Sequence, residues 1–204
     1  MQEIPYLSCV SEQDISVELD RSIRNALVVC FPADHEYYSK QSWWHCIPIY
    51  RVLARDSKDS VVAHAAVVER VIICEKSTEV RVAGIQSFCV LPKYRGISLS
   101  DKMMSVVVRE AKRRGFDAGL LFCLPKLEPV YGRMGWSRLD AAVYMADDKE
   151  NLPVRQTDGG RVRLARRGGQ AGRKLIPAKN IAMFYPLRIK QFPAGDIDLA
   201  GSDW

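Results

Sequence analysis

The chain has 204 residues, of which 48% are hydrophobic and 26% are charged, with a formal net charge of +6. This length and composition fit one globular domain with its own core, so we expect a single domain over residues 1–204. No apolar run approaches the roughly 20 residues of a membrane-spanning helix. The first residues lack the basic and apolar regions of a secretory signal, so we expect a cytoplasmic protein that does not enter a membrane.

The six cysteines are scattered through the chain, and none of them forms a Cys-x-x-Cys pair. Most lie inside apolar runs, which is typical of buried free thiols in a reducing compartment. Without ligand spacing, a zinc site is not expected, and we predict no metal centre.

The positive charge is concentrated in one segment. Residues 151–180 hold eight basic residues and one acidic residue, so this segment carries +7 and the rest of the chain −1. Residues 155–174 are rich in glycine and arginine, which predicts a basic flexible insertion at about 147–180. No aromatic residue occurs from Arg155 to Lys179, so the stacking surface of single-strand binding sites is missing and nucleic-acid binding is not expected.

Hydrophobic patterns predict alternating strands and helices along the first half of the chain. The expected strands span 6–10, 49–54, 61–74 and 80–90, and the expected helices span 14–31 and a short stretch within 37–44. Pro32 ends the long helix. The polar residues 55–60 between two β-branched runs predict a hairpin turn.

The second half begins with an amphipathic helix at 99–114, with Gly115 at its C-terminal cap. A continuously apolar run at 118–124 predicts a strand buried on both faces. A short helix at 128–134 and strands at 139–145 and 181–189 complete the expected elements.

The turn Arg95-Gly96-Ile97-Ser98-Leu99-Ser100 lies between the strand at 80–90 and the helix at 99–114. Backbone N–H groups in such a turn point into one concavity with the helix dipole behind them, which favours a diphosphate. An ordinary strand-to-helix turn has the same small residues, so the turn alone leaves both interpretations open.

Two flanking stretches add to this pattern. Val90-x-Pro92-x-Tyr94-Arg95-Gly96 leads into the turn, and Val130-Tyr131-x-x-x-Gly135-Trp136 follows later. Together they resemble the GNAT superfamily of acyl-CoA-dependent N-acyltransferases. Its pyrophosphate loop reads Arg/Gln-x-x-Gly-x-Gly/Ala, and its later motif ends in Tyr-x-x-x-Gly-Phe/Trp. Ser98 and Ser100 replace the two loop glycines here.

The resemblance implies an α/β (α+β) fold, with a mixed sheet of about six or seven strands flanked by about four helices. In that family the fourth and fifth strands splay apart, which here would be Val82–Val90 and Ala118–Leu124. A bulge at Gly84 or at Gln86-Ser87 would open the fourth strand. Acetyl-CoA, or another acyl-CoA, would lay its arm against the exposed edge like an added strand.

The resemblance also implies residue roles. The backbone N–H of Cys89 or Val90 would stabilise the oxyanion. The implied cofactor-binding residues are Phe88, Cys89, Val90, Arg95, Gly96, Ile97, Ser98, Leu99 and Ser100.

Acyl transfer in this family is direct, within a ternary complex, and two proton transfers accompany it. Tyr131 would protonate the leaving thiolate, and a core aromatic that merely packs the short helix is the less favoured alternative. Gln86 stands where the family often has a glutamate, and an amide cannot accept the proton of the incoming amine. Either the amine arrives neutral or another group acts as the base, with His64, Glu69 and Asp34 as candidates.

The stretch 62–70 is similar to the third strand of aminoglycoside 2′-N-acetyltransferases, whose chains end in an acidic tail closed by a tryptophan. This similarity implies an anionic rim that binds a small-molecule amine, such as an aminoglycoside or another amino sugar. The implied rim residues are Asp34, Trp44, Asp198, Asp203 and Trp204. A solvated tail that touches nothing is the alternative.

Two further alternatives stay open. The same strand and tail resemble the rhizobial nodulation acyltransferases, which move a fatty acyl chain onto an amino sugar. The replacements at Ser98, Ser100 and Gln86 are also compatible with a degenerate protein that binds acyl-CoA without turnover. The basic segment, placed on the cofactor side, would attract the CoA 3′-phosphate or an acyl-carrier protein, and a homodimer is compatible with the sequence.

Overall fold

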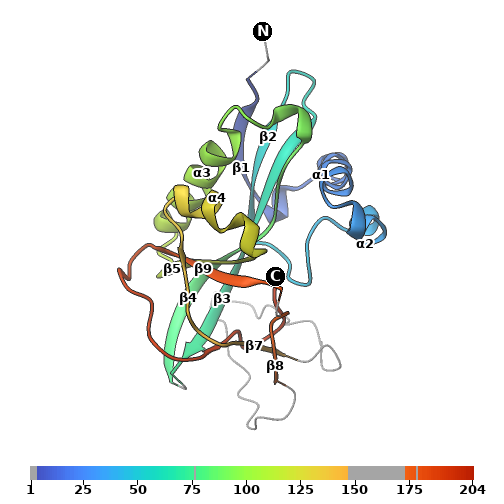
Figure 1. The fold of residues 1–204 in the computed structure, drawn as a ribbon. Helices are drawn as coiled ribbons and strands as arrows, with labels where there is room; N and C mark the ends of the chain where they lie inside the picture. Colours follow the sequence, from blue (N-terminus) through green and yellow to red (C-terminus); the bar gives the residue numbers. More distant parts are fainter. Residues whose placement is uncertain (1–3, 76, 147–172, 178) are drawn as a thin grey trace.

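The computed structural model describes residues 4–75, 77–146, 173–177 and 179–204 (Figure 1). Its strands form one mixed sheet in the order β6–β9–β5–β4–β3–β10–β7–β8. The strand β2 pairs with β3, and β1 pairs with β2. The strands are β1 Tyr6–Ser11, β2 Tyr50–Arg55, β3 Val61–Cys74, β4 Thr78–Val90, β5 Ala118–Cys123, β6 Ser137–Arg138, β7 Val143–Ala146, β8 Arg173–Leu175, β9 Ile181–Pro186 and β10 Ile197–Asp198.

Four α-helices cover the two faces of this sheet: α1 Val17–Cys30, α2 His35–Lys40, α3 Leu99–Arg113 and α4 Glu128–Arg133. Figure 1 shows α3 and α4 on one face and α1 and α2 on the other. The expected α/β fold with about four flanking helices is therefore confirmed. The sheet has more strands than the expected six or seven. The additional strands include β6, β8 and β10, which are only two or three residues long and therefore too short to be recognised from a sequence pattern.

Side chains of β4 alternate between the two faces, as the period of a strand requires. Ala83 and Ile85 belong to the cluster that α3 and α4 bury, whereas Val80 and Val82 belong to the cluster on the opposite face. The strand is thus buried on both sides, which explains its nearly continuous apolar sequence.

The strands β4 and β5 separate part-way along their length. Their parallel pairing runs from Val82 with Ala118 to Ile85 with Leu121. Beyond this point β4 continues beside β3, and β5 continues beside β9. The expected splay of these two strands is therefore present.

A one-residue bulge lies where the separation begins. On β3 the partners advance from His64 to Ala66, while on β4 they step from Cys89 to Gln86, so β4 holds one extra residue. Ser87 has a φ of +50°, the left-handed conformation of many bulge positions. The predicted bulge at Gln86-Ser87 is confirmed, and the alternative at Gly84 is not.

Several predicted boundaries were wrong. The first helix begins at Val17 because Ser16 caps it, accepting the Leu19 N–H at 3.2 Å. The strand expected at 139–145 begins only at Val143, as β7, and the short β6 lies before the expected range. The basic insertion expected at about 147–180 lies outside the described residues over 147–172, whereas Arg173–Leu175 forms β8 against β7.

Candidate active site

The loop after β4 presents backbone N–H groups at the start of α3. Gly96 and Ser98 have φ values of +79° and +57°, and these left-handed positions turn the chain into the helix. The first α3-type hydrogen bond runs from the Lys102 N–H to the Ser98 carbonyl, which leaves the amides of residues 99–101 without an intrahelical acceptor. The Ser98 side chain does not cap them. These donors suit an anion.

Arg95 and Arg133 are each held by a neighbouring group close to the start of α3. Arg95 folds back, and its Nε donates to the Val90 carbonyl at 3.0 Å. Arg133 of α4 bonds Asp101 of α3, with Nε to Oδ1 at 3.2 Å, and this hydrogen bond lowers the pKa of Asp101. The pair joins α3 to α4 and offsets the one acidic group of the first helical turn.

A groove of about 450 Å³ runs along α3 from this ion pair. Met104, Ser105, Val108, Arg109 and Lys112 form one wall, and Arg133, Met134 and Tyr185 form the other. Arg109 and Lys112 make this groove basic, beside the amides of the helix start.

The geometry of β4 beyond the bulge decides which amide faces the gap. The Leu91 N–H donates to the Val62 carbonyl of β3 at 2.9 Å. In an antiparallel ladder successive amides point to opposite sides, so the Cys89 N–H also faces β3 and the Val90 N–H faces the gap. Of the two expected oxyanion donors, only Val90 is directed towards the space between β4 and β5.

Tyr131 lies at the mouth of the same gap. It comes from α4, and its ring centroid is 6.2 Å from that of Phe88 on β4. It belongs to the buried cluster that also holds Cys123 of β5. Burial raises the pKa of Tyr131 well above its usual value, so the phenol keeps its proton at neutral pH.

Gln86 is fixed by the loop between α2 and β2. Its Oε1 accepts the Trp44 N–H, and its Nε2 donates to the Cys46 carbonyl at 2.6 Å. The side chain is 3% exposed. Only an amide supplies one donor and one acceptor here, so glutamine fits where a carboxylate would leave the Cys46 carbonyl without a donor.

A buried polar network around Arg51 contacts the start of the loop between α2 and β2. Arg51 of β2 is fully buried and forms two bonds to the Glu12 carboxylate, at 2.7 and 2.6 Å. Its Nη1 also donates to the Ser42 hydroxyl at 2.7 Å, and that hydroxyl donates to Asp20 of α1. The network therefore connects β2, α1 and the start of the loop.

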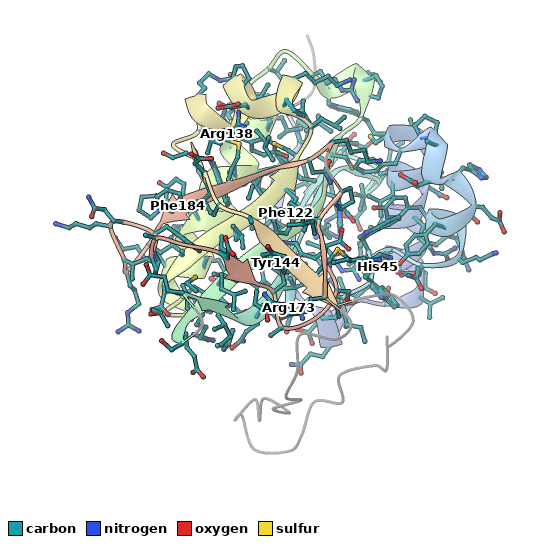
Figure 2. All side chains as sticks on the ribbon, turned by 60° about the horizontal axis from the view of Figure 1, so that its bottom comes forward. His45, Phe122, Arg138, Tyr144, Arg173 and Phe184 are labelled. Carbon is teal, nitrogen blue, oxygen red and sulfur yellow. The ribbon has the colours of Figure 1, made fainter. Side chains whose placement is uncertain are left out.

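The C-terminal tail docks against this loop. Asp203 bonds His45, with Oδ1 2.9 Å from Nδ1, and its carbonyl lies 3.5 Å from the Cys46 thiol. Trp204 is buried over Gly84, with its ring centroid 5.3 Å from that of Phe122. Figure 2 shows His45 on the side of the molecule that carries α1 and α2. The tail is thus packed against the sheet instead of being solvated.

The structure brings some of the expected acceptor residues together and separates one. Trp44 donates its N–H to Gln86, and Asp203 bonds His45 in the same loop. Trp204 packs on Gly84 of β4, two residues before Gln86, and Asp34 precedes α2 as its N-cap. Asp198 on β10 instead pairs with Arg173 of β8 at 3.2 Å. Figure 2 places Arg173 beside Tyr144, away from His45.

His64 is fully buried beneath the bulge. Its Nδ1 lies 2.9 Å from the Ser87 carbonyl, and because a carbonyl only accepts, Nδ1 carries the proton. Burial is the main cause that lowers the pKa of His64 to about 3. This placement favours a role in holding the bulge over the role of a base.

Comparison with known proteins places these features in a family. A model of the acetyltransferase (GNAT) domain matches residues 18–139, more than half of the chain. The chain belongs to the GNAT acetyltransferase family. A search of curated proteins finds no significant match.

Solved GNAT structures share the fold at low sequence identity. The N-acetyltransferase YhbS from Escherichia coli in complex with CoA has 12% identity and a TM-score of 0.57, over 98% of this chain and 91% of that one. An acyl-CoA N-acyltransferase from Pseudomonas aeruginosa has 12% identity and a TM-score of 0.56, over 88% and 98%. ElaA from Escherichia coli has 14% identity and a TM-score of 0.54, over 89% and 99%.

The family match and the CoA-bound relative support an acyl-CoA as the co-substrate of this GNAT protein. Among the described residues, no group of three or more His, Cys, Asp or Glu side chains is arranged to hold a metal ion. No helix in the described part of the chain is long and apolar enough to cross a membrane.

Proposed function

We propose that this protein transfers an acetyl group from acetyl-CoA to a primary amine of a small molecule, with an amino sugar as the favoured acceptor. The observation that carries the proposal is the gap between β4 and β5, which has the α3 amides at one end and Tyr131 at its mouth. The pyrophosphate of acetyl-CoA binds the amides of residues 99–101, and its arm pairs with the free edge of β4.

In this arrangement the thioester carbonyl accepts a hydrogen bond from the Val90 N–H. Charge that develops on this oxygen during attack is stabilised by a donor already in place. The amine nitrogen forms the new C–N bond, the C–S bond breaks, and Tyr131 gives its phenol proton to the leaving thiolate. Burial raises the pKa of Tyr131, so the phenol is protonated at neutral pH and has a proton to give when the thiolate leaves.

Two features favour this donor and this class of acceptor. Phe88 and Tyr131 face each other across the end of the gap with ring centroids 6.2 Å apart, which favours a small acyl group over a long chain. Asp34 and Asp203 supply negative charge on the side from which the amine arrives, and this attracts a cationic amino sugar.

The cofactor site is tested by calorimetry with acetyl-CoA and with longer acyl-CoAs. Arg95→Glu places a negative charge beside the pyrophosphate and should weaken acetyl-CoA binding on the order of tenfold. Arg21→Glu, an exposed reversal on α1, is the matched control and should leave affinity unchanged. Unchanged affinity in Arg95→Glu would remove the loop from the cofactor site, and tighter binding of long chains would indicate fatty acyl transfer.

The acid role is tested in the same protein. Tyr131→Phe should lower kcat about 100-fold while acetyl-CoA affinity stays the same, because only the proton donor is lost. Products are followed by mass spectrometry with aminoglycosides and simpler amino sugars as acceptors. Failure to acylate any primary amine, despite acetyl-CoA binding, would indicate a binding protein.

A further inference from the structure

The proposed reaction needs a group that removes a proton from a cationic amine, and two of the three expected candidates, His64 and Glu69, are engaged elsewhere. Gln86 is an amide bound to the loop. His64 is buried and bonded to Ser87. Glu69 pairs with Arg81 at 2.7 Å on the face of the sheet that α3 covers.

The pair His45–Asp203 has the geometry of a base held by a carboxylate. Asp203 Oδ1 accepts from Nδ1 of His45 at 2.9 Å, which places the imidazole proton on Nδ1 and leaves the lone pair of Nε2 free to accept a proton. The His45 side chain is 31% exposed and that of Asp203 is 15% exposed. The imidazole is therefore open to a ligand, while its carboxylate partner is shielded.

The backbone around His45 is bound directly to β4 beside the bulge. The residue before it, Trp44, donates its N–H to Gln86, and the residue after it, Cys46, accepts from Gln86. The His45 N–H donates to the Tyr37 hydroxyl at 3.0 Å, and the Trp44 ring lies 4.7 Å from the imidazole.

The conformation of His45 is itself unusual. Its φ is +48°, a left-handed value that costs a non-glycine residue free energy and persists where the surroundings impose it. The contacts with Gln86, Tyr37 and Asp203 provide that constraint. A strained, partly exposed histidine held from three sides is typical of a functional position.

We propose that His45, oriented by Asp203, is the general base that deprotonates the acceptor amine, an inference that rests on the proposed function. Nε2 takes one proton from the R–NH₃⁺ group, and the freed lone pair attacks the thioester carbon. His45 then releases this proton to solvent. The second N–H proton leaves after the C–N bond forms and restores the Tyr131 phenol through solvent.

Other ionisable groups lie around His45. Tyr37 faces it from α2, and the Cys46 thiol is adjacent in the loop. Arg70 of β3 donates to the Cys46 sulfur at 2.9 Å and lies 5.8 Å from the Trp204 ring. Asp203 thus places a negative charge in direct contact with the imidazole, and Arg70 places a positive charge beside Cys46.

The test compares His45→Gln and Asp203→Asn with His35→Gln, an exposed histidine of α2 that serves as the control. At neutral pH, His45→Gln should lower kcat/KM for the amine about 100-fold with unchanged acetyl-CoA affinity, and Asp203→Asn should lower it by a smaller factor. The deficit should shrink as the pH rises, because the acceptor then arrives as a free amine and needs no base. A purely structural loss would not recover in this way.

Chemical rescue provides a second measurement. His45→Gly keeps the left-handed backbone, which glycine adopts freely, and removes only the imidazole. Added imidazole should restore part of its activity and leave His35→Gln and Asp203→Asn unchanged.

The outcomes separate the two proposals. If the wild-type protein acylates amines and His45→Gln keeps full activity, the base role is overturned while the proposed function stands. A deficit that is equal at all pH values and not rescued by imidazole also overturns it. If the wild-type protein transfers no acyl group at all, the proposed function fails and the base role with it.

Discussion

The two halves of the proposed site are built in different ways. The proposed cofactor half comes from one continuous stretch, residues 78–133, in which β4, α3, β5 and α4 follow one another. The proposed acceptor half combines the loop after α2, Gln86 of β4 and the tail at Asp203 and Trp204, joined by contacts across up to 158 positions. A local motif can therefore specify the first half, whereas the second depends on the packing of distant segments.

The largest effect in this comparison is expected for Arg51→Ala. Removal of a fully buried guanidinium leaves the Glu12 carboxylate and the buried Ser42 without their partner, which should cost about 3–5 kcal/mol in the free energy of unfolding. Urea unfolding measures this loss. The KM for the amine should rise more than acetyl-CoA affinity falls, because the network supports only the acceptor half.

Arg113→Ala is the control for this substitution. That arginine is 70% exposed and pairs with Glu110 at 2.7 Å, so its loss should cost less than about 1 kcal/mol. Equal losses of amine and acetyl-CoA binding in Arg51→Ala would show that the two halves are not separable.

A smaller effect is expected for Gly84→Ala, where the tail meets the sheet. A Cβ at this position would overlap the Trp204 indole and lie 2.7 Å from Val68 Cγ2, so the tail must move. Overpacking of this kind should cost about 1–3 kcal/mol in urea unfolding. It should also impair acceptor binding, because Asp203 moves with Trp204.

Gly132→Ala in α4 is the matched substitution on the cofactor side. No atom lies within 4 Å of the added Cβ, so this variant should be as stable as the wild type or slightly more stable. If Gly84→Ala unfolds at the same urea concentration as the wild type, the docking of Trp204 over Gly84 is wrong.

His64 lies under the bulge between the two halves, and its burial should make the free energy of unfolding depend on pH. The pKa of His64 is about 3 in the folded protein and ordinarily 6.5, so between these values the unfolded chain binds a proton that the folded chain does not. Its contribution to stability is complete above pH 6.5 and falls by about 1.4 kcal/mol per pH unit as the pH decreases towards 3.

His64→Asn keeps a donor for the Ser87 carbonyl and removes the titrating group. Urea unfolding at several pH values from 7 to 4.5 should therefore show a shallower decline in the variant than in the wild type. Parallel declines in the two proteins would mean that His64 is already protonated, or exposed, in the folded state.

The sequence was informative wherever function depends on neighbouring residues. The loop at Arg95–Ser100, Tyr131 on its short helix and the bulge at Gln86-Ser87 could be located because turn residues, helix periodicity and a family motif are local signals. Ser98, which stands in place of one of the loop glycines, adopts the left-handed conformation that a glycine would otherwise provide.

The acceptor half could not be predicted in the same way. His45 directly follows Trp44, but the sequence does not indicate its pairing with Asp203, which is found only once the tail has packed on the sheet. Arg51 sits within a β-branched run where nothing indicates burial with Glu12. The strands β8 and β10 are too short to show a period, and pairing with β7 and β3 defines them.

The bulge at Ser87 decides which side chains of β4 face the proposed cofactor site. Before it, Ala83 and Ile85 face α3; after it, Phe88 and Val90 do so, because Gln86 and Ser87 together occupy one position of the ladder. If Ser87 instead took an ordinary strand position, Ser87 and Cys89 would face α3, and Phe88 and Val90 would point away, without any change of amino acid. Deletion of Ser87 would leave Phe88 and Val90 on the α3 side but would remove the bulge at which β4 separates from β5. The local backbone conformation of β4 is therefore as much a determinant of the site as its composition.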